Sequence, residues 1–188
     1  DSSGDITLRN VTTTNLVVTN NGTTSGSDIL DEGSLTVSGT SAFTTVVSDG
    51  VITLDSAHAL TGAVTLTTNS SSTSANATLD NGTTALNLAA STIGGDLTVT
   101  SGNLSGITDS GAVTVGGNLV ATTDASNGVI DLGSTTVTGT VALTTNGSGN
   151  ATFDNASLNI DLAASNVGGD LTVTSGAAAG ITDSGDVT

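Results

Sequence analysis

Residues 94–102 read GGDLTVTSG, and the same nine residues recur unchanged at 168–176, 74 positions later. A second block, GITDSG, stands at 106–111 and again at 180–185, also 74 positions apart. Self-similarity at a fixed spacing is typical of repeat proteins, in which each unit buries its apolar face against its neighbours. The sequence therefore predicts an array of repeats.

The correspondence extends through most of the chain at offsets of 74 to 78. Residues 62–69 match 139–146 at an offset of 77, because the Ser-rich stretch 70–76 is three residues longer than its counterpart at 147–150. We interpret residues 1–188 as a single β-helix segment with a little over two copies of a 74–78-residue repeat. We expect this segment to be part of a much longer protein.

Short apolar alternations follow one another inside each repeat. The runs 97–99 (LTV) and 113–115 (VTV) place apolar residues at alternate positions, and the run 107–109 (ITD) begins with one. Stretches with Gly, Ser or Asn separate the runs. Such alternation predicts β-strands, and the bounding residues predict turns. Segments that open with Gly mostly recur at intervals of about 22 positions. Three short strands in about 22 residues make one coil of a right-handed parallel β-helix, which is an all-β fold.

The same alternation predicts the register of the strands. Leu97 and Val99 should face the interior and Thr98 the solvent. The two aromatic side chains, Phe43 and Phe153, fall on predicted strands and are expected to fill the core. Stacking the coils at the Gly spacing gives two inward columns: Leu97, Leu119, Val141 and Leu171 in one, and Val99, Ala121, Leu143 and Val173 in the next.

Composition excludes several classes of partner. The chain has one basic residue, Arg9, against 17 acidic ones, and its formal net charge is −16. Nucleic acids and anionic membranes both require basic surfaces, so neither is an expected partner. No apolar run reaches the length of a transmembrane helix, so we expect no membrane insertion. The chain has no Cys, which excludes disulfides and thiol chemistry.

The repeated blocks resemble those of a known class of bacterial proteins. GGDLTVTSG and GITDSG, together with residues 79–81 and 86–90, are similar to the repeats of filamentous-haemagglutinin-type exoproteins, the two-partner secreted class. The resemblance implies a β-helix in a very large protein that is extracellular and lies at the bacterial cell surface. The repeats of that class have no catalytic residues that could be carried over to this chain.

The only histidine, His58, is the one candidate for a catalytic base of the Ser-His-Asp type. The corresponding segment of the next copy, 133–136, has no histidine, so we interpret His58 as an outward-facing residue without a catalytic role. Paired carboxylates on neighbouring coils would arise mostly as Asp-Asn and Asp-Ser turn residues, with Asp109 and Asp183 among them, and such side chains bond the local backbone. We predict no catalytic, cofactor-binding or metal-binding residue.

Two further binding hypotheses concern calcium and ice. Asp28, Asp31 and Glu32 form the densest acidic cluster, where a weak surface calcium site stays open, although the calcium-binding nonapeptide is absent. Thr-x-Thr runs would form outward columns of the kind that bind ice. Those columns are expected to break at Val120 and Ala142, which argues against that role.

We therefore expect a structural role without catalysis, as a shaft or filament segment of an adhesin-like surface protein. A ligand-binding adhesin module, which recognises glycans or host proteins on other cells through its loops, is the alternative. A polysaccharide-active β-helix enzyme is the third possibility. The first and last coils expose strand edges, so the expected partners are further copies stacked end to end or neighbouring repeats of the same long chain.

Overall fold

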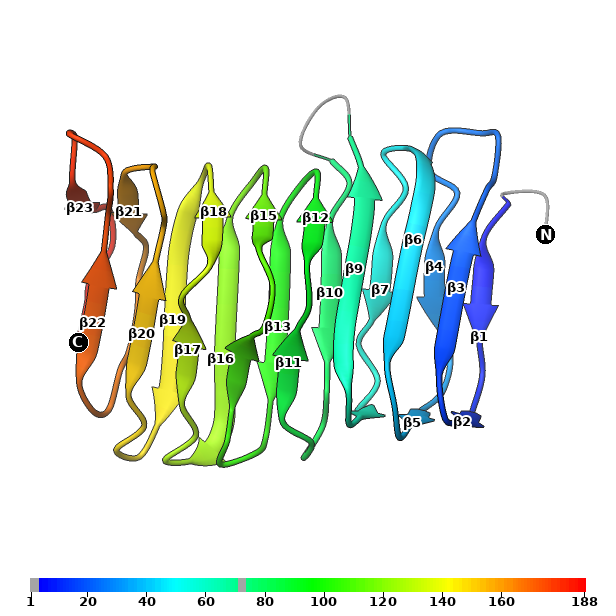
Figure 1. Cartoon of the computed structure of the whole chain (residues 1–188), viewed down its shortest axis with the longest axis horizontal. Coiled ribbons are helices and arrows are strands. Elements are labelled where there is room, and N and C mark those ends of the chain that lie inside the picture. Colours follow the sequence, from blue (N-terminus) through cyan, green and yellow to red (C-terminus); the bar gives the residue numbers. More distant parts are fainter. Residues whose placement is uncertain (1–3, 71–73) are drawn as a thin grey trace.

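The computed structural model describes residues 4–70 and 74–188, and these residues form a parallel β-solenoid. They contain 23 strands and no helix, and thus no helix long and apolar enough to span a membrane. The strands stack side by side along one axis from the N-terminal to the C-terminal end (Figure 1). The predicted all-β solenoid is confirmed.

One sheet, called the first sheet, runs the length of the rod. All its strand pairs are parallel, and inward residues pair with inward residues from coil to coil. Its nine strands are β1 (Ile6–Leu8), β4 (Ile29–Asp31), β7 (Ile52–Leu54), β10 (Ala77–Asp80), β13 (Leu97–Ser101), β16 (Leu119–Ser126), β19 (Thr140–Asn146), β21 (Ile160–Leu162) and β23 (Ile181–Asp183).

The second sheet lies across the core from the first and branches at β9 (Figure 1). It begins with β3 (Leu16–Asn20), β6 (Ser41–Ser48) and β9 (Ala63–Asn69). One branch continues with β11 (Leu86–Leu88), β14 (Ile107–Asp109), β17 (Ile130–Leu132), β20 (Ala151–Asp154) and β22 (Leu171–Thr174). The other continues with β12 (Ser91–Ile93), β15 (Val113–Val115) and β18 (Thr135–Val137). A small third sheet holds β2 (Val11–Thr13), β5 (Leu35–Val37) and β8 (Ala59–Leu60).

The coils have the predicted length. In the first sheet the register passes from Ile6 to Leu162 in seven steps, which corresponds to about 22 residues per coil. With β23 the chain completes about eight coils. At about 4.8 Å per coil, the rod is about 38 Å long.

Successive copies of the repeat lie on opposite faces of the rod. β9 belongs to the second sheet, whereas its counterpart in the next copy, β19, belongs to the first. β13 belongs to the first sheet, and its counterpart β22 belongs to the second. At about 22 residues per coil, one repeat spans about 3.5 coils. Each copy is therefore rotated by half a turn relative to the copy before it.

This half turn corrects the predicted inward columns. As predicted, one buried column joins Leu97, Leu119 and Val141. The residue that follows Val141 in the column is Leu162, whereas Leu171 pairs with Ala151 and Val173 with Phe153 on the second sheet. The reason is that the apolar stretch around Leu162 forms β21, a strand of its own, which shifts the next long strand to the other face.

The core consists of stacked aliphatic side chains. Leu97 is fully buried, and Thr98 on the same strand is partly exposed, so the predicted register is confirmed. Phe43 and Phe153 are both fully buried, as predicted. Burying one such large side chain contributes about 2 kcal/mol, and coil-to-coil stacking repeats this gain along the rod.

Candidate functional site

His58 does not face the solvent, and the prediction that it does is wrong. The residue is only 2% exposed to solvent. Its Nδ1 accepts a hydrogen bond of 3.0 Å from the N–H of Leu35 in the preceding coil. Its Nε2 lies 3.7 Å from Oδ2 of Asp31, whose side chain is also buried. The physical reason is strand alternation. Leu60 faces inward on β8, and the residue two positions before it faces inward as well.

The buried His58 and Asp31 side chains join neighbouring coils. The carboxylate of Asp31 accepts the N–H groups of Asp55 and Ser56 at 3.0 and 3.2 Å. His58 Nδ1 accepts the hydrogen bond from the N–H of Leu35, and His58 Nε2 has no hydrogen-bond partner. A Ser-His-Asp mechanism needs an imidazole nitrogen that faces the nucleophilic hydroxyl. The bonds that this pair does make are structural ones between consecutive coils.

His58 should make the N-terminal coils sensitive to acid. Burial lowers the pKa of His58, and the nearby carboxylates of Asp31, Asp80 and Asp55 only partly oppose that shift. Below the ordinary histidine pKa of about 6.5, the unfolded chain binds a proton that the native chain does not. Stability therefore falls as the pH drops from about 6.5 toward the lower native pKa, by up to about 1.4 kcal/mol per pH unit.

The test compares the wild type with His58→Thr, which installs the residue found at the corresponding Thr135. We expect the wild-type melting temperature, followed by circular dichroism, to fall between pH 7 and pH 5. The melting temperature of the His58→Thr variant should fall less over the same pH range, because the variant lacks the histidine contribution. Asp28, whose pKa is raised mainly by burial, titrates in both proteins and cancels in the comparison. Equal pH slopes in the two proteins would contradict the assignment.

The acidic cluster of Asp28, Asp31 and Glu32 does not converge on one point. Asp28 accepts the N–H of Val51 at 2.9 Å, Asp31 binds the next coil, and Glu32 forms an ion pair with Arg9. Within residues 4–70 and 74–188, no group of three or more His, Asp or Glu side chains is placed to hold a metal ion. The three carboxylates thus serve separate structural partners.

Turn side chains connect consecutive coils in a ladder. Asn76 Oδ1 accepts the N–H of Asp96 at 2.8 Å, and Asp96 Oδ1 accepts the N–H of Asn118 at 2.7 Å. Asn118 Oδ1 continues to the N–H of Thr140 at 2.9 Å. The sequence predicted bonds within each turn, as Asp80 indeed forms with the N–H of Gly82. The ladder shows that many such side chains bond the next coil instead.

A buried serine lies where one long strand gives way to two short ones. The first part of β9 pairs with β11 and a later part pairs with β12. Ser91 is the first residue of β12. Its Oγ accepts the N–H of Leu66 at 3.0 Å and donates to the C=O of Ala89 at 2.9 Å. Ser165 makes the same two bonds in the next copy, to Leu143 and Ala163. The serine hydroxyl therefore takes the place of a backbone hydrogen bond between strands at the point where the second sheet branches.

A buried asparagine lies at the opposite change. There two short strands of one coil, β7 and β8, are followed in the next coil by the single strand β10 and Asn81. Asn81 Oδ1 accepts the N–H of Leu60 at 2.9 Å, and its Nδ2 donates to the C=O groups of Leu60 and Ala85 at 3.1 and 2.9 Å. Asn155 makes the equivalent bonds in the next copy. Neither asparagine was predicted from the sequence as a buried link, although the repetition of Asp-Asn at an offset of 74 is a usable signal.

The outward threonines form a longer ladder than the sequence predicted. The column through Thr98 does break at Val120 and Ala142, as expected. An unbroken ladder of threonines lies instead on the second sheet. It continues from β9 to β12 through the pairing of Thr67 with Thr92. A single Thr column supports the sheet through cross-strand contacts. Its members are Thr19, Thr44, Thr67, Thr92, Thr114 and Thr136.

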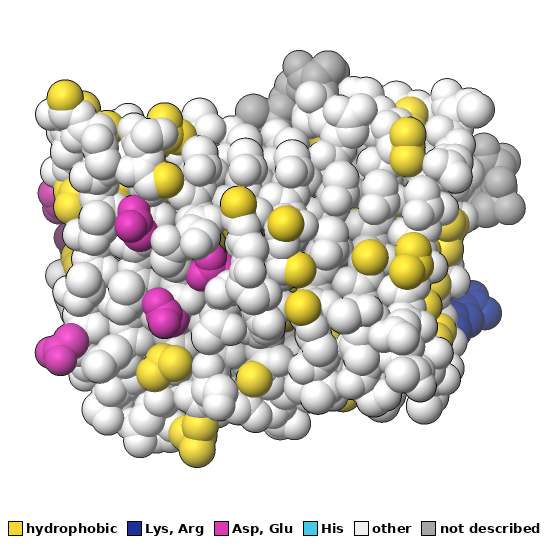
Figure 2. Space-filling model, in the orientation of Figure 1, with side chains coloured by type: hydrophobic (Ala, Val, Ile, Leu, Met, Phe, Trp, Pro, Cys, Tyr) yellow, Lys and Arg dark blue, Asp and Glu magenta, His cyan; other side chains and the backbone are white. Residues whose placement is uncertain are grey.

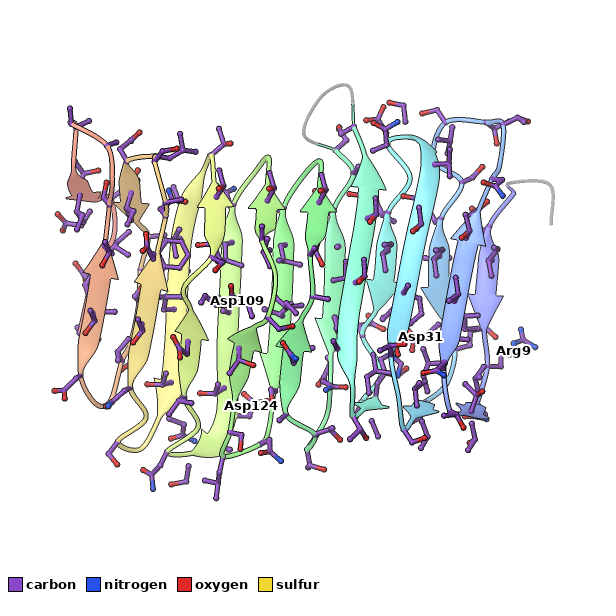
Figure 3. All side chains as sticks on the ribbon, viewed as in Figure 1. Arg9, Asp31, Asp109 and Asp124 are labelled. Carbon is purple, nitrogen blue, oxygen red and sulfur yellow. The ribbon has the colours of Figure 1, made fainter. Side chains whose placement is uncertain are left out.

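One face of the rod carries its charged side chains unevenly. On the face drawn in Figure 2, acidic side chains gather over the C-terminal half, and the basic side chain lies at the N-terminal edge. Figure 3 shows Arg9 projecting from that edge, whereas Asp109 and Asp124 come from coils farther along. On this face of the rod, the two ends therefore differ in charge.

Comparison with known proteins identifies a repeat family. A family model described as Repeats of unknown function (DUF5649) matches residues 1–67, 74–132 and 148–188, and the chain belongs to this family. The matched segments begin at positions 1, 74 and 148, a spacing close to that of the GGDLTVTSG blocks. No curated protein and no solved structure matches the chain.

Proposed function

We propose that this member of the repeat family is a structural shaft, a stiff segment that spaces other parts of a large protein. The observation that supports this role most directly is the use of polar side chains. Asp96, Asn118 and Asp109 each accept a backbone N–H from the following coil. Side chains that could form a binding site thus hold the coils together.

Stiffness follows from the continuity of the rod. Parallel sheets and one uninterrupted apolar core run through about eight coils. In such an array each coil contacts its neighbours, so length increases with every added repeat while the cross-section stays constant. At about 4.8 Å per coil, one repeat of about 3.5 coils adds about 17 Å.

The finer proposal is a filamentous-haemagglutinin-type shaft in an adhesin-like protein that is secreted and lies outside a bacterial cell. The likeness of the GGDLTVTSG and GITDSG blocks to those exoprotein repeats supports it. The absence of Cys from the chain suits a protein that crosses an oxidising compartment unfolded. We propose that the segment does not itself turn over a substrate.

The test of the shaft role is a chain with one extra copy of residues 95–168, inserted after Gly168. We expect small-angle X-ray scattering to show a rod about 17 Å longer with an unchanged cross-sectional radius. A bent or thickened particle would contradict the role. Saturable binding of glycans would favour the adhesin module. Release of reducing ends from polyuronates, lost in Asp109→Ala, would favour the enzyme.

A further inference from the structure

A row of outward threonines crosses the second sheet without a break. This row, called the Thr ladder, takes one member from each of six successive coils: Thr19, Thr44, Thr67, Thr92, Thr114 and Thr136. The break at Val120 and Ala142 lies on the first sheet and does not interrupt the ladder. Because neighbouring strands lie about 4.8 Å apart, the hydroxyl and methyl groups of the ladder repeat at about that distance along the rod.

A second row of small side chains runs beside the Thr ladder. Each member stands two residues before a ladder threonine, so the two rows lie about 6.6 Å apart along the strands. All of its members are exposed or partly exposed, none is charged and none is larger than valine: Val17, Ala42, Thr65, Ala90, Ala112 and Ser134. The two rows together form a regular grid, which we call the Thr face.

The hydroxyls of the Thr ladder make no hydrogen bond to the described part of the protein. Inward threonines differ, since Thr45 and Thr123 donate to the C=O groups of Gly50 and Gly128, both at 3.0 Å. Each ladder hydroxyl is exposed or partly exposed and is therefore free to bind water. The methyl group beside it restricts the orientation of the first water layer. The ladder thus holds water molecules at regularly repeated positions.

The core holds the Thr face rigid from below. Phe43, Leu66 and Ile93 stand next to ladder threonines in the chain, and all three are buried. The pairing of consecutive strands fixes the distance from each coil to the next. Water bound to the Thr ladder therefore keeps the spacing of the coils. That spacing is close to the repeat between equivalent water molecules along one axis of hexagonal ice.

Charge and area favour an uncharged, extended partner over a second copy of the chain. Figure 2 shows no charged side chain among the described residues over β6 and β9, although each copy carries a charge of −16. Two copies face to face would bring these charges together. The Thr face covers about 400 Å², so such a pair would bury about 800 Å², less than the roughly 1,200 Å² of a stable interface. Ice is flat, periodic and uncharged.

We propose that the Thr face binds ice. The hydroxyls of the Thr ladder hold water molecules at lattice positions, and the small side chains of the second row let the ice surface approach the sheet. This binding is a function in addition to the proposed shaft role, and the stacked coils of the shaft set the period of the array.

The test uses the full chain and two tyrosine variants on opposite faces of the rod. Thr67→Tyr places a ring in the middle of the Thr face. Thr122→Tyr places one on the first sheet, in the outward row that begins with Asp80. Thr67 and Thr122 are both partly exposed. Each protein is mixed with a control protein that has no affinity for ice, and hexagonal ice is grown slowly from dilute buffer. The ratio of the two proteins is measured in the ice and in the remaining liquid.

We expect the wild type and Thr122→Tyr to be enriched in the ice alike, and the enrichment of Thr67→Tyr to be at least about tenfold lower. Thr114→Tyr replaces Thr67→Tyr if circular dichroism shows that the latter is misfolded. Exclusion of the wild type from ice, or equal losses in the two variants, would overturn the proposal. So would self-association of a wild type that is not enriched in ice, since the Thr face would then bind a second copy. The shaft role would still stand if the rod lengthened with an added repeat.

Discussion

Replacing Asn155 with alanine is expected to lower the free energy of unfolding by about 3 kcal/mol or more. The side chain is fully buried, and its Oδ1 accepts the N–H of Val137 at 2.6 Å. Its Nδ2 donates to the C=O groups of Val137 and Asn159 at 3.0 and 2.7 Å. Alanine would leave three backbone groups without these partners, and each buried unpaired group costs about 1–3 kcal/mol. Urea unfolding followed by circular dichroism measures the loss.

Two variants serve as comparisons for this result. Asn159→Ala removes an exposed amide side chain from the same turn and should change stability by less than about 0.5 kcal/mol. Asn81→Ala removes the equivalent buried side chain from the preceding copy and should reproduce the large loss. A small effect at both Asn81 and Asn155 would mean that other contacts hold the strands where the sheet order changes.

A second large effect is expected from removing one whole repeat. Deleting residues 95–168 joins Gly94 to Gly169 and leaves the sequence GGDLTVTSG intact across the junction. The shortened chain should fold, because strand 171–174 can pair with β10 as β13 does. It should lose about 17 Å of rod. Its C-terminal strands should lie on the opposite faces of the rod from those that they occupy in the full chain.

The matched control removes one coil, not a repeat. Deleting residues 97–118 joins Asp96 to Leu119, which occupies the register position of Leu97 in the next coil. This chain should fold without rotation and lose about 5 Å of length. Circular dichroism and small-angle scattering report folding and length. A repeat deletion that unfolds beside a coil deletion that folds would contradict the equivalence of the two faces.

The coil and its register could be predicted from the sequence because both depend on local alternation. Leu97 and Thr98 alternate within one strand, and the Gly spacing fixes the coil length. The half turn was missed because identical blocks were assumed to stack on the same face. Dividing the repeat length by the coil length shows that the repeat is not a whole number of coils. The added stretches at 86–90 and 160–164 supply the extra half.

The buried polar residues were harder to recognise. His58 was assigned to the surface because its counterpart is not histidine, although its spacing from Leu60 places it inward. Asn155 looks like an ordinary turn residue, since Asn is common in turns and its burial depends on a change in sheet order. Side chains that replace strand hydrogen bonds can be identified only once the neighbouring strands are known.

The half turn between repeats is tested most directly by spin-label distances in the Cys-free chain. Thr98 and Ala142 lie on one outward column two coils apart, so labels on Cys at these positions should be close, with backbones about 10 Å apart. Thr98 and Thr172 occupy identical positions in successive copies, but they lie on opposite sheets. Their labels should be separated by the core, by both label arms and by an axial rise of about 17 Å. A Thr98–Thr172 distance only about 5 Å beyond the Thr98–Ala142 distance, as on one shared face, would contradict the half turn.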